Sequence, residues 1–437
     1  MKMVSNKKQN QRLRECYYKM RHKSGLDVYV FPKKLTVAYA LFGTKYGSVD
    51  NCFRFGDSSK IMTVSNGIAH YLEHRMFTQK DGSDITERFS EYGADANAYT
   101  TFTKTVYLFS CTENFDQSLG ALVDFVTEPY FTEELVDKER GIIAEEIKMG
   151  DDNPYDCCFY GLLEAMYQNN NVRINIAGTE ASVSEITADM LNDCYCAFYN
   201  PSNMALVVCG DVTPEQVMFT VEQHIPSDFV QIETERFFSE EPKAVYQKKY
   251  EAYMPIAKPI FTIGIKDSEL GNAMERMARD AAMQILCEMI FSRSGRLYTE
   301  LFEKGMISPD LSYGYSIAER FAFVTVGGEA EDPMAVFECI KAYIREMQKN
   351  GLSATSFERA KRVMLAEYIK DFDSTEEIAN NMMDFIFDGG DIFDCLDALE
   401  QVTLGDVERL LQTAFDEEFF CISVIYPEDI KKEDNNE

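Results

Sequence analysis

The sequence of 437 residues lacks any run of about 20 uninterrupted apolar residues, which is the length that a membrane-spanning helix needs. Apolar residues make up 46% of the chain and charged residues 27%, which is the balance of a soluble globular protein. Residues 1–24 are rich in Lys and Arg, but no apolar segment follows them, so they do not read as a secretory signal. We therefore expect two or three globular domains and no membrane partner.

Positive charge is scarce as well. The chain has 43 Lys and Arg against 73 Asp and Glu, which gives a formal net charge of −30. This charge argues against nucleic acid as a partner, because phosphate binding needs a basic surface. An acidic surface can attract cationic peptides, but we favour the simpler interpretation that it keeps the protein solvated.

Paired cysteines of the kind that bind structural zinc are missing. The chain has 12 Cys, and none of them forms a CxxC pair. Cys157 and Cys158 are adjacent, and one residue separates Cys194 from Cys196, so neither pair has a suitable spacing. Free and mostly buried thiols are the expected state, and they predict a protein of the reducing cytoplasm.

The first half of the chain alternates predicted strands and helices. Segments 27–32 and 35–49 predict neighbouring strands, and 204–209 predicts a buried strand that closes the half. Residues 98–110, AYTTFTKTVYLFS, are dense in β-branched and aromatic side chains and predict another strand. Helical patterns lie between these strands, at residues 66–78, 83–92, 115–126, 132–149, 160–167 and 187–198.

The same order returns in the second half. Residues 231–248 are polar and rich in Glu and Lys, which predicts a linker. Beyond it, strands are predicted at 259–264, 311–328 and 418–426, and helices at 273–304, 333–348 and 353–369. The repeated order predicts an α+β fold of two homologous domains, each a mixed, mostly antiparallel sheet covered by helices. The predicted domains are residues 1–230 and 249–437.

Histidine is rare, and two of the few histidines stand close together. The four are His22, His70, His74 and His224. On a helix, His70, Glu73, His74 and Phe77 share one face, and imidazoles four residues apart can reach one metal ion. The simpler alternative is a pair of histidines that only form local hydrogen bonds.

A catalytic zinc site needs a third protein ligand and one open position. The best candidate segment is 139–146, ERGIIAEE. Glu139 and Glu146 are seven residues apart, two helical turns, and so lie on one face. A solvated helix surface could carry the same carboxylates, and composition does not choose between Glu145 and Glu146.

Together these residues resemble a known family. Residues 67–77, GIAHYLEHRMF, resemble the inverted HxxEH zinc motif of the pitrilysin and insulinase peptidases. Residues 93–100, GADANAYT, resemble the family's GAxxNAxT strand, and 139–154 resemble its third-ligand helix. Residues 199–204 and 210–211 resemble the strand that ends the first domain. The resemblance covers the first half by motif and the second by layout, and it is closest to short two-domain bacterial members, including those like mitochondrial processing peptidase and the Bacillus insulinase-like proteins.

This resemblance implies one half of a clamshell-shaped peptidase with one Zn²⁺ per chain. His70, His74 and Glu146 are the implied metal ligands. Glu73 is the implied catalytic base that activates water. Glu139 takes the supporting position behind His74 or the metal, and we count it with the catalytic groups.

The resemblance also implies how substrate is held. A peptide should add as an extra strand at the edge near residues 98–107, with Asn97, Ala98 and Thr100 contacting it, and Phe77 should line the pocket for the side chain after the cut. Core packing of Phe77, or an internal strand in which Asn97 only stabilises a turn, are the alternatives. The implied function is a zinc endopeptidase that cuts short unstructured peptides in a closed chamber.

One departure from the family pattern concerns the second half. Self-sufficient relatives carry an Arg and a Tyr there, in a segment like LRxxxxLGY, whereas this sequence has LFEKGMIS at 301–308. Arg296 and Tyr298 lie upstream at a different spacing. The resemblance therefore implies a homologous metal-free partner subunit that supplies the pair, or a homodimer. A catalytically idle scaffold or a peptide-binding subunit of the same fold is the alternative function.

Overall fold

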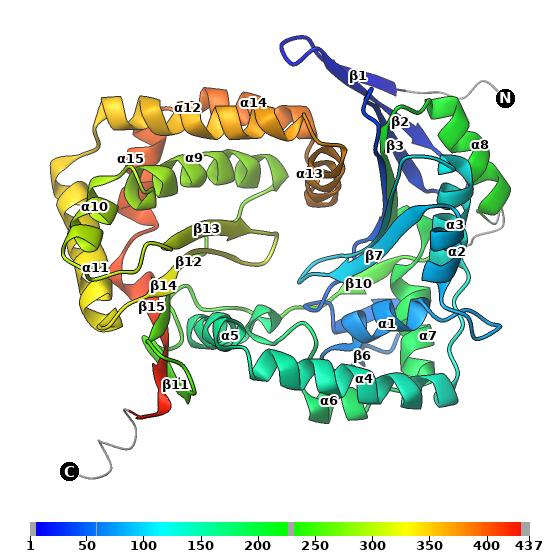
Figure 1. Cartoon of the computed structure of the whole chain (residues 1–437), viewed down its shortest axis with the longest axis horizontal. Helices are drawn as coiled ribbons and strands as arrows, with labels where there is room; N and C mark the ends of the chain where they lie inside the picture. Colours follow the sequence, from blue (N-terminus) through cyan, green and yellow to red (C-terminus); the bar gives the residue numbers. More distant parts are fainter. Residues whose placement is uncertain (1–5, 58, 226–230, 430–437) are drawn as a thin grey trace. The chain divides into compact units, whose positions relative to one another are not determined.

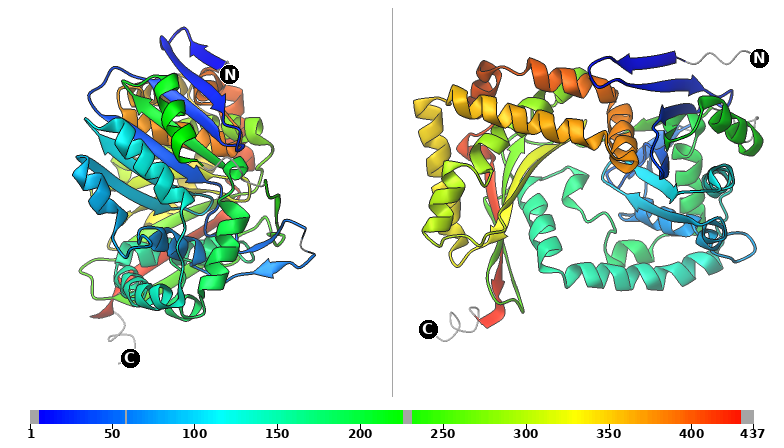
Figure 2. Two further views of the ribbon diagram at one scale, coloured as in Figure 1. Left: turned by 90° about the vertical axis from the view of Figure 1, so that its right-hand side faces the viewer. Right: turned by 45° about the horizontal axis from the view of Figure 1, so that its top comes forward.

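The computed structural model describes residues 6–57, 59–225 and 231–429, which form two compact units (Figures 1 and 2). The first unit contains Met1–Ile147, Asn175–Phe238 and Ile369–Phe387, and the second contains the rest of the chain. Each unit is built on one main sheet with helices packed against it. The predicted α+β class is confirmed.

The main sheet of the first unit has seven strands in the order β1-β2-β3-β9-β4-β8-β7. Strands β3 and β9 are parallel, and the other neighbours are antiparallel. The central strands β4 and β9 are buried along their whole length, as the apolar run of β9 predicts. The bounds are β1 (Asn6–Asn10), β2 (Glu15–Arg21), β3 (Asp27–Pro32), β4 (Ala38–Thr44), β7 (Ala94–Thr100), β8 (Thr105–Cys111) and β9 (Met204–Gly210).

A small second sheet in this unit has the order β10-β5-β6. Its strands are β5 (Cys52–Phe55), β6 (Met62–Thr63) and β10 (Thr234–Arg236). The predicted linker 231–248 therefore contains a strand, since β10 pairs with β5.

The sheet of the second unit has five strands in the order β11-β15-β12-β14-β13. Its strands are β11 (Lys249–Met254), β12 (Ile260–Asp267), β13 (Ser312–Ile317), β14 (Ala322–Glu329) and β15 (Phe420–Pro427). Strands β11 and β15 are parallel, and the remaining neighbours are antiparallel. The same order and directions occur in β3-β9-β4-β8-β7 of the first unit, which is the relation that a duplicated domain requires.

The helices of the first unit cover its main sheet (Figure 1). Helix α1 begins directly after Gly67, whose φ is 88° and whose missing Cβ would lie 2.3 Å from the carbonyl oxygen of Ala177. Only glycine fits this left-handed and crowded position. The helices are α1 (Ile68–Met76), α2 (Ile85–Glu91), α3 (Phe115–Thr127), α4 (Glu133–Asp151), α6 (Glu180–Ser184), α7 (Ala188–Phe198) and α8 (Pro214–His224).

Two helices are exchanged between the halves of the chain. Helix α5 (Pro154–Met166) comes from the first half but packs on β11, β12 and β15 of the second unit. Helix α13 (Thr375–Asp388) comes from the second half, yet Met383 and Phe387 pack against Gly43 in β4. The other helices of the second unit are α9 (Ala273–Phe291), α10 (Arg296–Glu303), α11 (Pro333–Asn350), α12 (Ala354–Asp371), α14 (Ile392–Gln401) and α15 (Leu404–Thr413). The domain bounds 1–230 and 249–437 stay a prediction.

Several predicted elements are wrong in their extent. Segment 98–110 is not one strand, because β7 ends at Thr100 and a turn, in which Thr101 N donates to Lys104 O at 2.8 Å, leads into β8. The turn residues TFTK include none of the usual turn formers, so the sequence gives no signal for it. Segment 311–328 is likewise two strands, and 273–304 is two helices separated at Ser292–Gly295.

All twelve cysteines are free thiols and seven of them are buried, as expected from their spacing. In the described part of the chain, no helix combines the length and the apolar character needed to cross a membrane.

The contact of α13 with the turn between β7 and β8 includes one largely buried charge. Lys104, in the β7–β8 turn, pairs with Asp384 of α13, and its side chain is 13% exposed against 56% for Asp384. Burial lowers the pKa of Lys104 to about 8. The pair therefore joins the exchanged helix to the turn that ends β7.

We predict that Asp384→Asn lowers the free energy of unfolding by about 1 kcal/mol, because the largely buried ammonium of Lys104 loses its counter-charge. Lys104→Met removes the charge that burial penalises, so it should cost less than Asp384→Asn. Urea denaturation of both variants measures the difference. The matched control is Glu377→Gln at an exposed position of α13, and an equal loss in Asp384→Asn and this control would contradict the prediction.

Candidate metal site on helices α1 and α4

The site is built where α1 meets α4 and the end of β7 (Figure 1). The buried hydroxyl of Tyr71 in α1 donates a hydrogen bond to the carbonyl oxygen of Val136 in α4. Tyr71 and Leu72 are fully buried, while His70 and His74 remain partly exposed on the other face of α1. The helical period thus separates an apolar packing face from a polar face.

The polar face meets a carboxylate of α4. His70 Nε2 lies 3.5 Å from Glu146 Oε1, and His74 Nε2 lies 3.4 Å from Glu146 Oε2. A hydrogen bond from His70 lowers the pKa of Glu146 below its ordinary value, although partial burial opposes this shift. Glu146 is therefore ionised at neutral pH, with both imidazoles facing it.

The donor set fits a zinc ion. One ligand atom from each of His70, His74 and Glu146 can be chosen so that all three lie within 4.8 Å of one another. Two ligands that bind one tetrahedral zinc at about 2.0–2.1 Å are themselves about 3.3 Å apart, close to the separations between these imidazoles and the carboxylate. Two nitrogens and one oxygen are also the ligand types of a catalytic zinc with one open position. In the described part of the chain, the carboxylate in this group is Glu146 and not Glu145.

Glu139 and Arg75 form a second layer of contacts next to His74. Glu139 Oε1 lies 3.3 Å from His74 Nδ1, and Arg75 Nη1 donates to Glu139 Oε2 at 3.1 Å. Burial raises the pKa of Glu139, but the hydrogen bonds and charges of His74 and Arg75 outweigh it and lower that pKa below its ordinary value. The ionised carboxylate therefore accepts from His74 Nδ1 and leaves Nε2 directed at Glu146.

Arg75 is a residue whose role the sequence did not suggest. Its side chain is only 1% exposed, and Nη1 also donates to Thr78 Oγ1 at 3.2 Å. The sequence did contain one sign of this role, because Arg75 lies on α1 between the apolar residues Leu72 and Met76, which are buried. A guanidinium buried with them needs a carboxylate partner. Glu139 is that partner.

Glu73 lies buried beside the two imidazoles. Its Oε2 accepts a hydrogen bond from Thr100 Oγ1 at 2.8 Å, where β7 ends. Burial raises the pKa of Glu73 above its ordinary value, although His70, Thr100 and His74 act in the opposite direction. A carboxylate of raised pKa that is not among the three grouped donors is suited to accept and return a proton.

The remaining predicted site residues lie along α1 and β7. Phe77 packs against Phe125 in an edge-on arrangement, with ring centroids 4.9 Å apart, so its environment is that of a core residue. Asn97 is exposed, and its Oδ1 accepts from the backbone N–H of Ala98 at 2.8 Å. Strand β7 is not internal, since it stands at one end of the seven-stranded sheet.

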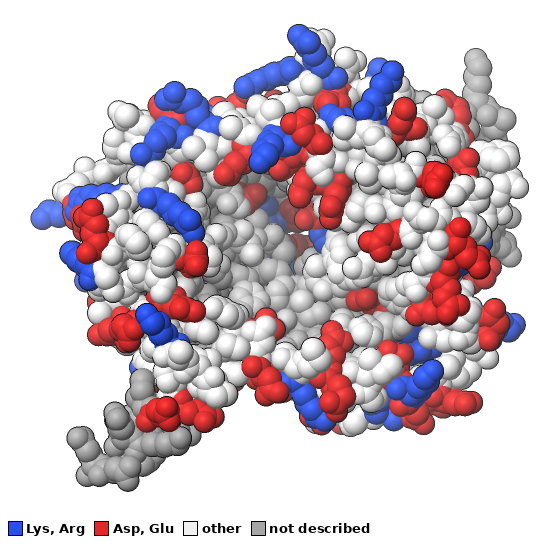
Figure 3. Space-filling model, viewed as in Figure 1, with Lys and Arg blue, Asp and Glu red and all other residues white. Residues whose placement is uncertain are grey.

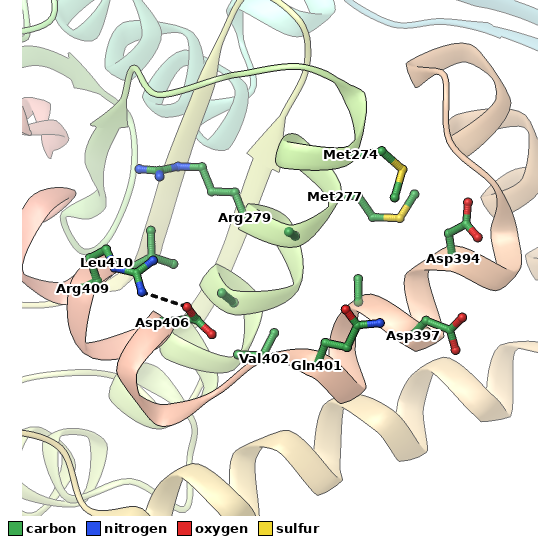
Figure 4. Close-up of a pocket in the computed structure, with 13 residues that line it drawn as sticks. Met274, Met277, Arg279, Asp394, Asp397, Gln401, Val402, Asp406, Arg409 and Leu410 are labelled. Atoms are coloured by element: carbon green, nitrogen blue, oxygen red, sulfur yellow. Dashed lines mark hydrogen bonds and ion pairs between the residues drawn. The ribbon is translucent and has the colours of Figure 1, made fainter.

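The second unit contains a separate cavity of about 520 Å³ between α9, α14 and α15 (Figure 4). Met274 and Met277 line one side, and Asp394 lies across from them. Arg409 is paired with Asp406 at 3.0 Å within the same wall. No histidine lines this cavity, so it offers no imidazole ligand for a metal.

We predict that Glu139→Gln weakens zinc binding about 10- to 100-fold, the usual effect of losing a partner behind a metal-binding histidine. The metal-free protein should also unfold at lower temperature, because the buried Arg75 loses the negative charge of Glu139. Competition with a chromogenic chelator measures the affinity, and calorimetry measures the unfolding. The matched control is Glu145→Gln, at an exposed position of the same helix. Unchanged zinc affinity in Glu139→Gln would contradict the supporting role.

Comparisons with known proteins agree with this arrangement. Residues 62–180 match the family profile described as insulinase (peptidase family M16), and residues 185–364 match the peptidase M16 inactive domain. The uncharacterized zinc protease YmfH of Bacillus subtilis is 39% identical over 408 residues, which cover 92% of this chain and 94% of YmfH.

Solved structures show the same relationship. An M16-like protein from Alicyclobacillus acidocaldarius is 31% identical and superposes with a TM-score of 0.90, over 98% of this chain and 99% of that one. The periplasmic protease PqqL of Escherichia coli shares the fold at 16% identity and a TM-score of 0.76, and 98% of this chain covers 49% of PqqL. The chain belongs to the insulinase family of peptidases, family M16.

Proposed function

We propose that the protein is a zinc-dependent endopeptidase that binds one Zn²⁺ per chain and cuts short unstructured peptides in a closed chamber. The observation that carries this proposal is the meeting of His70, His74 and Glu146 with Glu73 beside them. Relatives described as zinc proteases support the choice of metal. His70, His74 and Glu146 would hold the ion.

Bound zinc supplies Lewis acidity, which lowers the pKa of a bound water and polarises the scissile carbonyl. Glu73 accepts the proton of the attacking water and later delivers it to the leaving amine. The Thr100 hydroxyl holds the Glu73 carboxylate in place for both transfers. Glu139 keeps His74 in the tautomer whose Nε2 faces the ion.

The outer edge of β7 is the proposed binding surface for the substrate peptide. On its other side β7 pairs with β8, so its outer N–H and C=O groups can pair with an extended peptide. Backbone pairing reads no particular sequence, which suits a broad range of unstructured peptides. Asn97 and Ala98 lie on this strand and would contact the substrate, and Thr100 ends it beside Glu73.

A partner subunit is part of the proposal. Arg296 forms ion pairs with Glu300 at 2.7 Å and with Glu346 at 2.8 Å. The Tyr298 hydroxyl donates a hydrogen bond to the carbonyl oxygen of Pro309. These local contacts support the view that neither residue grips substrate in this chain. A homologous metal-free subunit, or a second copy of this chain, would complete the chamber. The free thiols support a cytoplasmic location.

We predict that the protein, incubated with a mixed peptide pool and the homologous metal-free subunit, yields new fragments that a zinc chelator abolishes. Glu73→Gln should keep stoichiometric zinc and lose at least 10³-fold of the cleavage rate, because the proton acceptor is gone while the ligands remain. Mass spectrometry measures the fragments and metal analysis the zinc. A purified chain without stoichiometric zinc would favour an idle scaffold, and peptide binding without any fragments would favour a peptide-binding subunit.

We also predict that cleavage depends on a second subunit. Adding a homologous chain that lacks the HxxEH residues and carries the Arg and Tyr should raise the cleavage rate by at least tenfold. Size-exclusion chromatography should show the two chains together. A rate for the chain alone that equals the rate of the mixture would refute the need for that partner.

A further inference from the structure

The cavity between α9, α14 and α15 lies within the second unit and shares no residue with the candidate metal site. Its volume of about 520 Å³ falls in the range of about 300–1,000 Å³ that is usual for small-molecule sites. Two of its lining residues, Met274 and Asp397, are exposed, so the cavity opens to solvent. A dissolved molecule can therefore enter it.

The inner wall of this cavity is apolar. On α9, Met274, Ala278 and Ala282 follow one another at intervals of four residues, so they share one helical face. The short alanine side chains leave space beside α9, and methionine adapts its shape to what it contacts. An apolar wall that faces water is unfavourable, and the apolar part of a ligand would remove that contact. The lining residues that are buried are Met277, Ala282, Val402 and Leu410.

The charged residues of the lining favour a cation. Asp394, Asp397 and Asp406 contribute carboxylates, whereas the two guanidiniums, of Arg279 and Arg409, already have carboxylate partners. Arg279 Nε lies 2.6 Å from an oxygen of Asp267, which is outside the lining, and Arg409 Nη2 lies 3.0 Å from Asp406 Oδ1. In the part of the chain that the structure describes, no ion pair engages Asp397. The lining therefore keeps negative charge that a ligand could neutralise.

The apolar and acidic residues face one another across the cavity (Figure 4). Met274 and Met277 extend from α9, and Asp394 and Asp397 stand on α14 on the opposite side. These two aspartates are three residues apart, so they lie on one side of α14, one turn from each other. A molecule between the two helices meets thioethers on one side and carboxylates on the other.

We propose that this cavity is a binding site for a small organic cation, an ammonium or guanidinium group carried on an aliphatic body. The cationic group lies beside Asp397 and Asp394, and the aliphatic body packs against Met277 and Ala278. Because the site is built only from residues of the second unit, binding does not require zinc. The bound cation bridges α9 and α14 and so stabilises the folded second unit.

The test is isothermal titration calorimetry of the full chain with three compounds. Octyltrimethylammonium carries both the charge and the chain, tetramethylammonium carries the charge alone, and octanoate carries a chain with the opposite charge. We expect octyltrimethylammonium to bind as one ligand per chain and about tenfold or more tightly than either of the others, because it alone matches both the carboxylates and the apolar wall. Equal affinity for octanoate, or several bound ligands per chain, would overturn the assignment.

Two variants locate the binding in the cavity. Ala278→Phe fills it and should weaken octyltrimethylammonium binding about tenfold, with Ala354→Phe at an exposed position of α12 as the matched control. Asp397→Asn removes one carboxylate charge and should weaken the binding about threefold, with the exposed Glu358→Gln of α12 as its control. Unchanged affinity in Asp397→Asn, or equal losses in the controls, would count against the site even where Ala278→Phe fails to fold.

This binding is separable from the proposed peptidase function. Octyltrimethylammonium should bind equally well before and after a chelator has removed zinc, and a loss of binding with the metal would contradict the assignment. Failure of the peptidase proposal has a different signature, namely no chelator-sensitive peptide cleavage in a protein that still binds the cation.

Discussion

The candidate site depends on one buried electrostatic contact between α1 and α4. The carboxylate of Glu139 accepts a hydrogen bond from Nη1 of the buried Arg75 with one oxygen and meets the imidazole of His74 with the other. Because both partners come from α1, this carboxylate ties α4 to two neighbouring residues of α1. Glu146, two turns further along α4, is then carried to within reach of His70 and His74. The hydrogen bond from the Tyr71 hydroxyl to the Val136 carbonyl oxygen joins the same two helices.

The repeated strand order explains why the part of the chain that the structure describes has two similar sheets, although only the first of them is accompanied by a candidate metal site. Five strands of each main sheet share their order and directions, and β12 leads to α9 in the second unit as β4 leads through β5 and β6 to α1 in the first. The sequence of α9 contains no histidine, so this copy of the framework has no imidazole ligand at its first helix. Helix α5 of the first half belongs to the second unit, and most of helix α13 of the second half belongs to the first unit. Each unit therefore contains residues from both halves of the sequence.

Charge on the surface is a separate matter from the chemistry of the site. Figure 3 shows Asp and Glu spread over the visible face among Lys and Arg, which agrees with an acidic surface that serves mainly to keep the protein solvated. The carboxylates that matter chemically are few and are distinguished by burial. Glu73 and Glu139 are withdrawn from solvent and held by named partners, so their ionisation responds to the site and not to the net charge.

The sequence alone determined the features that depend on local periodicity. The helical period placed His70, Glu73 and His74 on one face, and the spacing of Glu139 and Glu146 put both on one face of a second helix. The α+β class and the repeated order of elements also followed from local patterns. Tertiary structure decided what depends on contacts between distant segments: the grouping of Glu146 with the imidazoles, the pairing of buried Arg75 with Glu139, the turn between β7 and β8, and the exchange of α13. Those contacts arise from side-chain packing between segments far apart in the chain, and no local pattern encodes them.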